Sequence, residues 1–186
     1  MAISIKTPGV RFPHIVITCL LMFAGSAMAR DLGHGRVGMR GEILDSACGV
    51  DTASQDQTID MLYQPLSEII SSGGGIPRPF SIRLVNCSLQ RHSPNNLPVD
   101  DWQYFKVTFD GVRNHGAFGV EGNARGVALQ IRDAQGNIAN PGQALPAGNI
   151  EAGTMKLNYT LRLVGDGDNL SAGSYHSTIR YKLDYY

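Results

Sequence analysis

Several short segments of the chain alternate apolar with polar residues. Because successive side chains of a β-strand point to opposite faces, a period of two predicts half-buried strands. The clearest runs cover residues 80–85, 104–110, 127–131 and 155–163. Stretches rich in glycine and proline separate these runs and predict loops, notably residues 63–79, with a short helical turn at 66–70, and residues 137–153.

The final segment, residues 173–186, has the same pattern. Six alternate positions would form a largely apolar face: Tyr175, Ser177, Ile179, Tyr181, Leu183 and Tyr185. The positions between them are polar and would face water: His176, Thr178, Arg180, Lys182 and Asp184. The segment contains no proline, so it predicts a strand that either joins a sheet or is kept for a partner chain. The simpler interpretation is the last strand of a complete sandwich.

Two weaker strands are expected earlier in the chain. Residues 40–48 would form one strand that ends at Cys48, with Ile43 and Leu44 as its apolar residues. Residues 58–62 form a possible second strand. No segment keeps a helical period for three turns. Many short strands separated by turn-rich loops predict an all-β protein with an antiparallel β-sandwich.

The amino terminus has the features of a cleaved export signal. Lys6 and Arg11 precede an apolar run of about ten residues, which is shorter than the roughly 20 residues that span a bilayer. Ala27 and Ala29 then form a small-residue cleavage site. We therefore expect residues 1–29 to be removed, leaving one domain in an exported protein, and no later segment is apolar for long enough to anchor it in a membrane.

Cysteine usage fits this export. Cys19 lies in the apolar run of the signal, which leaves Cys48 and Cys87 as an even pair in an oxidising compartment. A disulfide between these two cysteines is therefore expected. Closing a loop of about 40 residues would stabilise the fold by about 4 kcal/mol in the chain-entropy description.

Composition and motifs give no support for catalysis or nucleic-acid binding. The full sequence has 16 basic and 16 acidic residues, so loss of the signal leaves no basic excess with which to bind phosphates. The histidines of the exported part are scattered, without the H-E-x-x-H spacing of a zinc site: His34, His92, His115 and His176. No G-x-S-x-G elbow is present either, so we expect no enzyme, metal or cofactor. Trp102 and Tyr104 could stack on a sugar in a secreted carbohydrate-binding sandwich, but a single tryptophan at the entry of a strand more often belongs to the core.

The motifs together resemble the subunits of chaperone–usher fimbriae of Gram-negative bacteria. The resemblance rests on the signal, a glycine-bearing amino-terminal arm, and the segments around the two cysteines, residues 40–48 and 80–87. Further support comes from residues 127–136 and from the terminal segment, with Gly173 fourteenth from the end and Tyr185 penultimate. Residues 107–113 and 136–141 are most similar to the minor subunit that terminates and anchors P-type pili.

This resemblance implies an immunoglobulin-like sandwich that lacks its last strand, formed by residues 40–186. It also implies that residues 30–39 are an arm donated to a neighbouring subunit, although a disordered leader is the alternative. The arm residues of interest are Leu32, Gly33, Gly35, Val37 and Met39. The residues expected to line the open groove and to be read by a chaperone are Gly173, Tyr175, Ile179, Tyr181, Leu183, Tyr185 and Tyr186.

The implied partners are a periplasmic fimbrial chaperone, an outer-membrane usher and neighbouring fimbrial subunits, and the implied location is the cell-surface fimbrium. A chaperone would fill the groove by strand addition until the arm of the next subunit replaces it. Whether the chain is a terminating subunit or a major subunit of the shaft depends on whether the groove has an open initiating pocket. That feature does not follow from the sequence.

Overall fold

The computed structural model describes residues 35–41, 43, 45–93 and 97–186, which fall into two units, residues 1–42 and 43–186. The predicted signal peptide, Leu32 and Gly33 therefore lie outside the described residues. In the first unit, residues 35–41 have no helix or strand, and their side chains are exposed.

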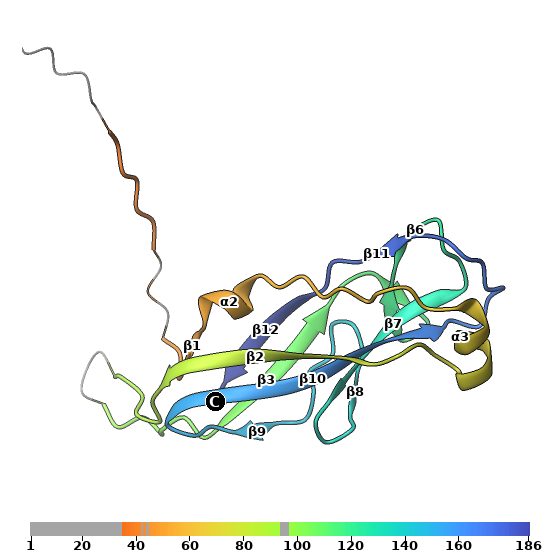
Figure 1. Ribbon diagram of the computed structural model, residues 1–186. Helices are drawn as coiled ribbons and strands as arrows, with labels where there is room; N and C mark the ends of the chain where they lie inside the picture. The colour runs from red at the N-terminus through yellow and green to blue at the C-terminus, as the bar shows by residue number, and fades with distance from the viewer. Residues whose placement is uncertain (1–34, 42, 44, 94–96) are drawn as a thin grey trace, which may run out of the picture. The chain divides into compact units, whose positions relative to one another are not determined.

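The regular elements of the second unit are strands, apart from two short helices in its first part (Figure 1). The strands are β1 (Gly49–Val50), β2 (Arg78–Cys87), β3 (Tyr104–Asp110), β4 (Arg113–Asn114), β5 (Ala117–Gly119), β6 (Glu121–Gly122), β7 (Val127–Asp133), β8 (Ile138–Ala139), β9 (Gly148–Asn149), β10 (Gly153–Gly165), β11 (Tyr175–His176) and β12 (Arg180–Tyr185). The helices are α2 (Thr52–Gln55) and α3 (Leu66–Ser72).

The strands form two main sheets, and all of the strand pairs are antiparallel. The larger sheet has the order β1-β2-β10-β7-β5-β4, with β8 beside β7, and the smaller has the order β12-β3-β9. A further short ladder joins β11 to β6. The predicted all-β class is therefore confirmed, and the fold is an incomplete immunoglobulin-like sandwich.

Inward-facing side chains of the two sheets form one core. Phe109 of β3 packs edge-to-face on Tyr159 of β10, with the ring centroids 5.0 Å apart. Phe80 of β2 stacks on the same Tyr159 ring at 5.3 Å and meets Phe109 edge-on at 6.2 Å. Ile82 and Leu84 of β2 are fully buried. Each such large apolar side chain stabilises the fold by about 1.5–3 kcal/mol, so the period-two pattern directs the sandwich.

The four clear strand predictions are confirmed by β2, β3, β7 and β10, and the predicted helical turn is α3. The two weaker predictions are wrong. Of residues 40–48, those described form no strand, because β2 ends at Cys87 and offers the preceding segment no further partner. Residues 58–62 are also outside any strand, although Ile59 is half-buried and Met61 is buried.

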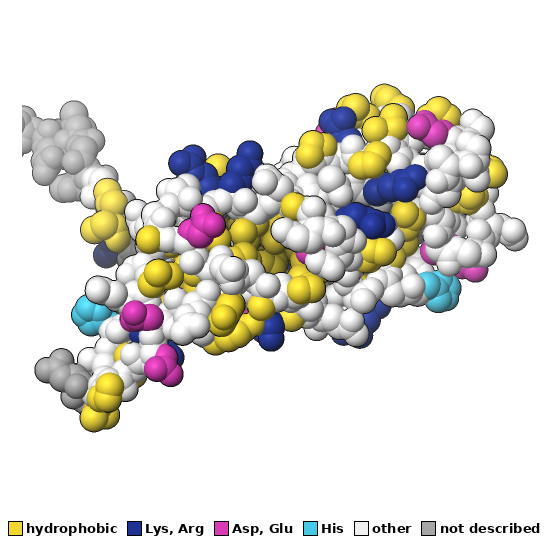
Figure 2. Space-filling model, turned by 90° about the horizontal axis from the view of Figure 1, so that it is seen from below, with side chains coloured by type: hydrophobic (Ala, Val, Ile, Leu, Met, Phe, Trp, Pro, Cys, Tyr) yellow, Lys and Arg dark blue, Asp and Glu magenta, His cyan; other side chains and the backbone are white. Residues whose placement is uncertain are grey.

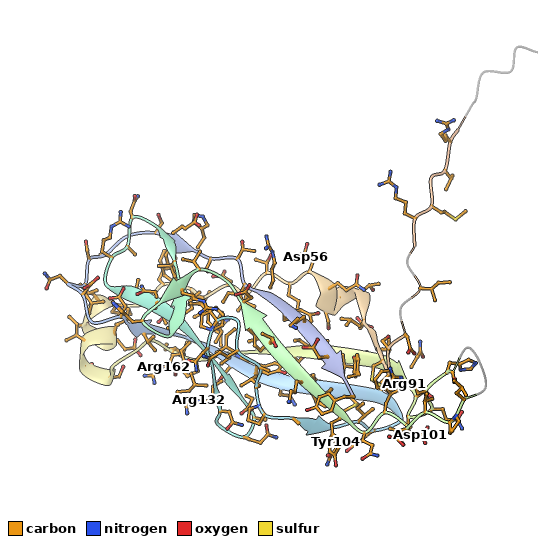
Figure 3. All side chains as sticks on the ribbon, turned by 180° about the vertical axis from the view of Figure 1, so that it is seen from behind. Asp56, Arg91, Asp101, Tyr104, Arg132 and Arg162 are labelled. Atoms are coloured by element: carbon orange, nitrogen blue, oxygen red, sulfur yellow. A yellow bond between two sulfur atoms is a disulfide. The ribbon has the colours of Figure 1, made fainter. Side chains whose placement is uncertain are left out.

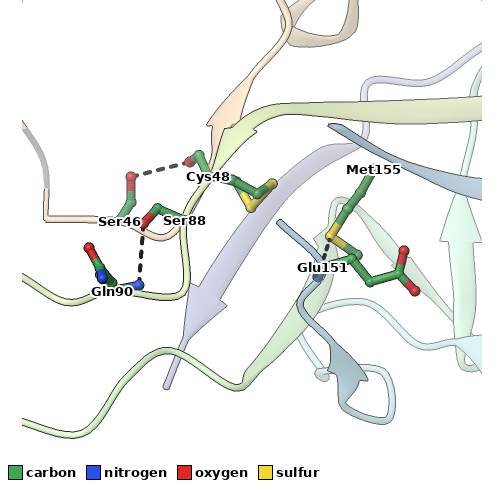
Figure 4. Close-up of a disulfide and its surroundings, with 7 residues drawn as sticks. Ser46, Cys48, Ser88, Gln90, Glu151 and Met155 are labelled. Atoms are coloured by element: carbon green, nitrogen blue, oxygen red, sulfur yellow. Dashed lines mark hydrogen bonds between the residues drawn. A yellow bond between two sulfur atoms is a disulfide. The ribbon is translucent and has the colours of Figure 1, made fainter. Parts of the chain in front are cut away.

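The predicted disulfide joins Cys48, just before β1, to Cys87 at the end of β2 (Figure 4). Both cysteines are buried in the core. Beside the disulfide, the Ser88 amide donates a hydrogen bond to the Ala47 carbonyl at 2.8 Å. The covalent link thus fixes the start of the domain to the edge of the larger sheet.

Arg162 of β10 holds α3 against the larger sheet (Figure 3). Its Nε donates to the Gly75 carbonyl at 2.9 Å, and its Nη2 donates to the carbonyls of Ser72 and Gly74 at 3.1 and 3.3 Å. These carbonyls belong to the last residue of α3 and to the residues just after it, where Gly73 adopts φ +67 in the left-handed region that glycine enters without penalty. A charged side chain therefore satisfies the carbonyl end of the helix.

Candidate functional site

The terminal strand β12 lies at an edge of its sheet and is paired on one flank only. Its residues pair with β3 from Arg180↔Asp110 to Tyr185↔Phe105, and in the described part of the chain no strand lies along its other flank. The unpaired amide and carbonyl groups of such an edge are a template for another strand. The terminal segment thus has the free edge that an incomplete sandwich requires.

Beside this edge lies an apolar groove of about 1380 Å³. One wall is formed by residues 54–64, and the opposite wall by residues 171–181. The floor consists of core side chains from four strands: Phe80, Ile82, Phe109, Leu129, Ile131, Leu161 and Leu163. The groove therefore exposes part of the hydrophobic interior at the place where the sandwich has no strand.

Burial along the terminal segment follows the predicted alternation. Tyr175, Ile179 and Tyr181 are half-buried and line the groove, while Leu183 and Tyr185 are half-buried further along β12. The intervening side chains are exposed. The strand is interrupted, however, since residues 177–179 lie between β11 and β12 and belong to neither ladder.

Apolar surface is exposed elsewhere on the domain as well. Figure 2 shows one face on which hydrophobic side chains are visible along the middle, between flanks that carry basic and acidic groups. Near α3, Leu62, Tyr63, Ile70 and Ile76 are all more than half exposed. Exposed apolar patches of this kind are typical of proteins that work in an assembly.

Three tyrosine hydroxyls of the terminal segment differ in their hydrogen bonds. The Tyr181 hydroxyl donates to the Ser54 carbonyl on the opposite wall at 2.8 Å. By contrast, the buried hydroxyl oxygens of Tyr175 and Tyr185 have no hydrogen-bond partner among the described residues. Burial raises the pKa of all three phenols, with a smaller contribution from Asp60 at Tyr175, and that of Tyr185 reaches about 12. The phenols therefore remain neutral near pH 7.

Gly173 lies where the terminal segment passes closest to another part of the backbone. A Cβ at this position would lie 2.5 Å from the Ala124 nitrogen and 2.6 Å from the Asn123 carbonyl carbon. The amides of Asn123 and Ala124 donate to the Ser174 carbonyl at 2.8 and 3.1 Å, which keeps the two segments together. Glycine is therefore required here by close packing at the end of the groove wall.

The opposite end of the terminal strand is packed by aromatic side chains. Trp102 is buried and meets the Tyr185 ring at 6.3 Å, and the Arg91 guanidinium lies 4.3 Å from the centre of the Trp102 ring. The Tyr186 carbonyl accepts hydrogen bonds from the amides of Gln103 and Tyr104. Tyr186 is thus held on the β3 side and does not line the groove.

Of the predicted arm, Gly35, Val37 and Met39 are described. Val37 is 85% exposed and Met39 is 90% exposed, so neither apolar side chain is buried by this chain. Sequence reasoning missed the groove wall formed by residues 54–64, because no pattern in that segment marks it as the boundary of a missing strand. The alternation of residues 58–62 predicted a strand there, but it did not indicate that a neighbouring strand is missing.

The described residues contain no group of three or more His, Cys, Asp or Glu side chains placed to hold a metal ion. Within the same residues, no helix is long and apolar enough to cross a membrane. The site that the described residues form is an apolar groove beside an unpaired strand edge.

Comparison with known proteins identifies relatives of the whole domain. The PRS and PAP fimbrial minor pilin proteins of Escherichia coli are 38% and 37% identical over 153 residues, which cover 81% of this chain and 77% of each relative. The Pap fimbrial major pilin protein of the same species is 25% identical, covering 82% of this chain and 84% of the relative. No protein-family model matches. A solved chaperone–usher pilus has the same fold, with a TM-score of 0.67, 24% identity, and coverage of 83% of this chain and 97% of that one.

Proposed function

The chain belongs to the pilin subunits of chaperone–usher fimbriae, and we propose that it is a structural subunit completed by a strand from another protein. The observation that carries the proposal is the edge strand β12, paired on one flank and adjoining an apolar groove of about 1380 Å³. An added strand would pair with the free backbone groups of β12 and cover the exposed core. Both changes stabilise the domain.

The occupant that fits this groove is an extended chain with alternate apolar side chains. The floor is formed by aliphatic and aromatic groups, so side chains with a period of two would enter it while the others remain in water. In the proposed assembly, a strand of a periplasmic chaperone occupies the groove first, and the arm of a neighbouring subunit replaces it. An outer-membrane usher would be the site of this replacement.

The arm that this chain donates in turn would be residues 30–39. Support comes from Val37 and Met39, which share one parity and are almost fully exposed. Gly35 lies on the same parity and would fit where the acceptor leaves no room for a side chain. The proposed route starts with removal of residues 1–29, passes through the periplasm, and ends in a fimbrium on the surface of a Gram-negative cell.

We further propose that the chain is a minor subunit that terminates or anchors the fibre. Its identity is 38% and 37% to the two minor pilins and 25% to the Pap major pilin over similar lengths. A major shaft subunit is the second candidate. The two roles differ in whether the groove exchanges its chaperone strand for an incoming arm, since a terminating subunit would donate an arm but accept none.

Export of the full chain in Escherichia coli, with and without a co-expressed P-type fimbrial chaperone, tests the proposal. We expect a soluble one-to-one complex with the chaperone and aggregation or degradation without it, because the groove exposes core residues. A stable folded monomer made without any partner would contradict the proposal and favour the secreted carbohydrate-binding sandwich. Adding arm peptides to the purified complex and measuring chaperone release would then separate a shaft subunit, which exchanges, from a terminating one.

A further inference from the structure

The groove is shorter than the unpaired edge beside it. Along the terminal segment, the lining covers residues 171–181 and ends at Tyr181 in the described chain. Leu183 and Tyr185 continue the half-buried face of β12 but do not line the groove, and the Tyr185 ring packs against Trp102, which is 6% exposed. The edge thus has an open part beside the groove, which ends at Tyr181, and a closed part beyond it, residues 182–185.

A single hydrogen bond lies at the boundary between the two parts. The Tyr181 hydroxyl donates to the Ser54 carbonyl in α2 at 2.8 Å, across 127 positions of sequence. Ser54 is itself fixed to the larger sheet, because the Arg83 amide donates to its Oγ at 3.0 Å. The Asp51 amide also donates to the Arg83 carbonyl at 2.9 Å. A continuous line of hydrogen bonds therefore connects β12, through α2, to β2.

We propose that the Tyr181–Ser54 hydrogen bond is a latch at the end of the groove, so that a strand pairing with all of β12 must break it. A shorter strand that pairs only up to Ile179 docks with the latch closed. The inference rests on the proposed function, since it concerns how a strand enters the same groove. It assigns Tyr181 a role in selecting the length of the strand and the order in which the strand docks.

Other contacts at the boundary make a clean test possible. The Ser54 carbonyl also accepts from Gln57 Nε2 at 3.3 Å, so Tyr181→Phe does not leave this carbonyl without a partner. The Tyr181 ring remains packed near Phe109, with centroids 6.3 Å apart, and does not need its hydroxyl for that contact. Tyr185→Phe is a matched control, because it removes a hydroxyl from the same face of the same strand that has no partner among the described residues.

The probes are two synthetic peptides of alternating valine and threonine with a lysine at each end. The short one has seven residues, matching positions 173–179, and the long one has thirteen, matching positions 173–185. Each carries fluorescein, and binding to the refolded full chain is followed by anisotropy. Trp102, the only tryptophan in the sequence, packs on Tyr185 and reports arrival of a strand at the closed part.

We expect Tyr181→Phe to increase the affinity and association rate of the long peptide about fivefold, which is the effect of not having to break one hydrogen bond. Binding of the short peptide should be unchanged, and only the long peptide should alter Trp102 fluorescence. Tyr185→Phe should leave both peptides within twofold of the parent chain. If the free chain aggregates, each peptide is present during refolding of each of the three chains, and the amount of soluble peptide-bound chain is measured with the same order of variants expected.

The outcomes separate the latch from the function on which it rests. Equal or weaker binding of the long peptide to the Tyr181→Phe chain, while the parent chain binds both peptides, overturns the latch and leaves the strand-addition groove intact. An equal gain from Tyr185→Phe also overturns it. Failure of both peptides to bind any of the three chains overturns the latch, whereas the proposed function is overturned only if the chain also folds as a stable monomer without any partner.

Discussion

Replacement of Gly173 by alanine tests whether the end of the groove wall depends on close backbone packing. The added Cβ would lie 2.5 Å from the Ala124 nitrogen, about 1 Å closer than ordinary van der Waals contact, and the obstacle is backbone that cannot rotate away. Relief of the overlap costs about 1–3 kcal/mol by itself. Separation of the two segments would also weaken the two hydrogen bonds to the Ser174 carbonyl, each contributing about 1 kcal/mol. We therefore expect a loss of about 2–4 kcal/mol in the free energy of unfolding.

The assay is urea unfolding of the oxidised chain, followed by Trp102 fluorescence. Gly165→Ala is the matched control, because a Cβ at Gly165 has its nearest neighbour, the Gly126 carbonyl oxygen, at 4.0 Å. That variant should change the free energy of unfolding by less than about 0.5 kcal/mol. Two results would refute the reasoning: a Gly173→Ala chain as stable as the parent, or an equal loss in both variants. In either case, the overlap with residues 123–124 would not be what requires glycine.

Three further predictions concern other stabilising features. Reduction of the Cys48–Cys87 disulfide, which joins positions 39 apart, should lower the free energy of unfolding by about 4 kcal/mol, seen as a lower urea midpoint in dithiothreitol; an unchanged midpoint would contradict this. Burial, with a smaller contribution from Tyr181, raises the pKa of Tyr185 from 10.0 to about 12. The stabilisation by the neutral phenol is therefore fully present below pH 10 and is lost as the pH rises through 12. Tyr185→Phe should therefore reduce the loss of unfolding free energy at alkaline pH by about 1 kcal/mol, a value lowered because water partly screens the half-buried ring. The same dependence of stability on pH in both chains would contradict this prediction. Arg162→Met should speed amide hydrogen exchange of α3 about tenfold or more, because it removes three charge-assisted hydrogen bonds from the end of the helix. The control variant Arg132→Met, at an exposed position, should leave exchange of α3 unchanged. Equal exchange in both variants would show that Arg162 does not stabilise α3.

The sequence predicted those parts of the fold in which the alternation within one strand determines which side chains are buried. β10 places Tyr159, Leu161 and Leu163 in the core and alternates them with less buried positions, so its period of two was sufficient. The disulfide followed from the even number of cysteines that remain after the signal. Neither inference required knowledge of which strands are neighbours.

The groove was harder to predict because it depends on contacts between distant parts of the chain. The Tyr181–Ser54 hydrogen bond joins residues 127 positions apart, and the Gly173 contact depends on the path of residues 123–124. Trp102 was assigned either to a core or to a sugar-binding surface, and the structure places it in the core beside Tyr185. None of these contacts leaves a periodic signal in the sequence.

The incorrect strand prediction at residues 58–62 has a physical explanation that bears on the site. The segment has the burial of a strand, since Met61 is buried and Ile59 half-buried, while Asp60 between them and the flanking positions 58 and 62 are exposed. It nevertheless has no ladder, because a strand requires a hydrogen-bonded neighbour as well as a buried face. The groove lies on one side of it, and across that groove is the unpaired flank of β12. One added strand would supply the missing hydrogen-bonded neighbour to both walls of the groove. The alternation in the sequence therefore matches the completed sandwich, whereas the unpaired backbone groups are those of the subunit without the added strand.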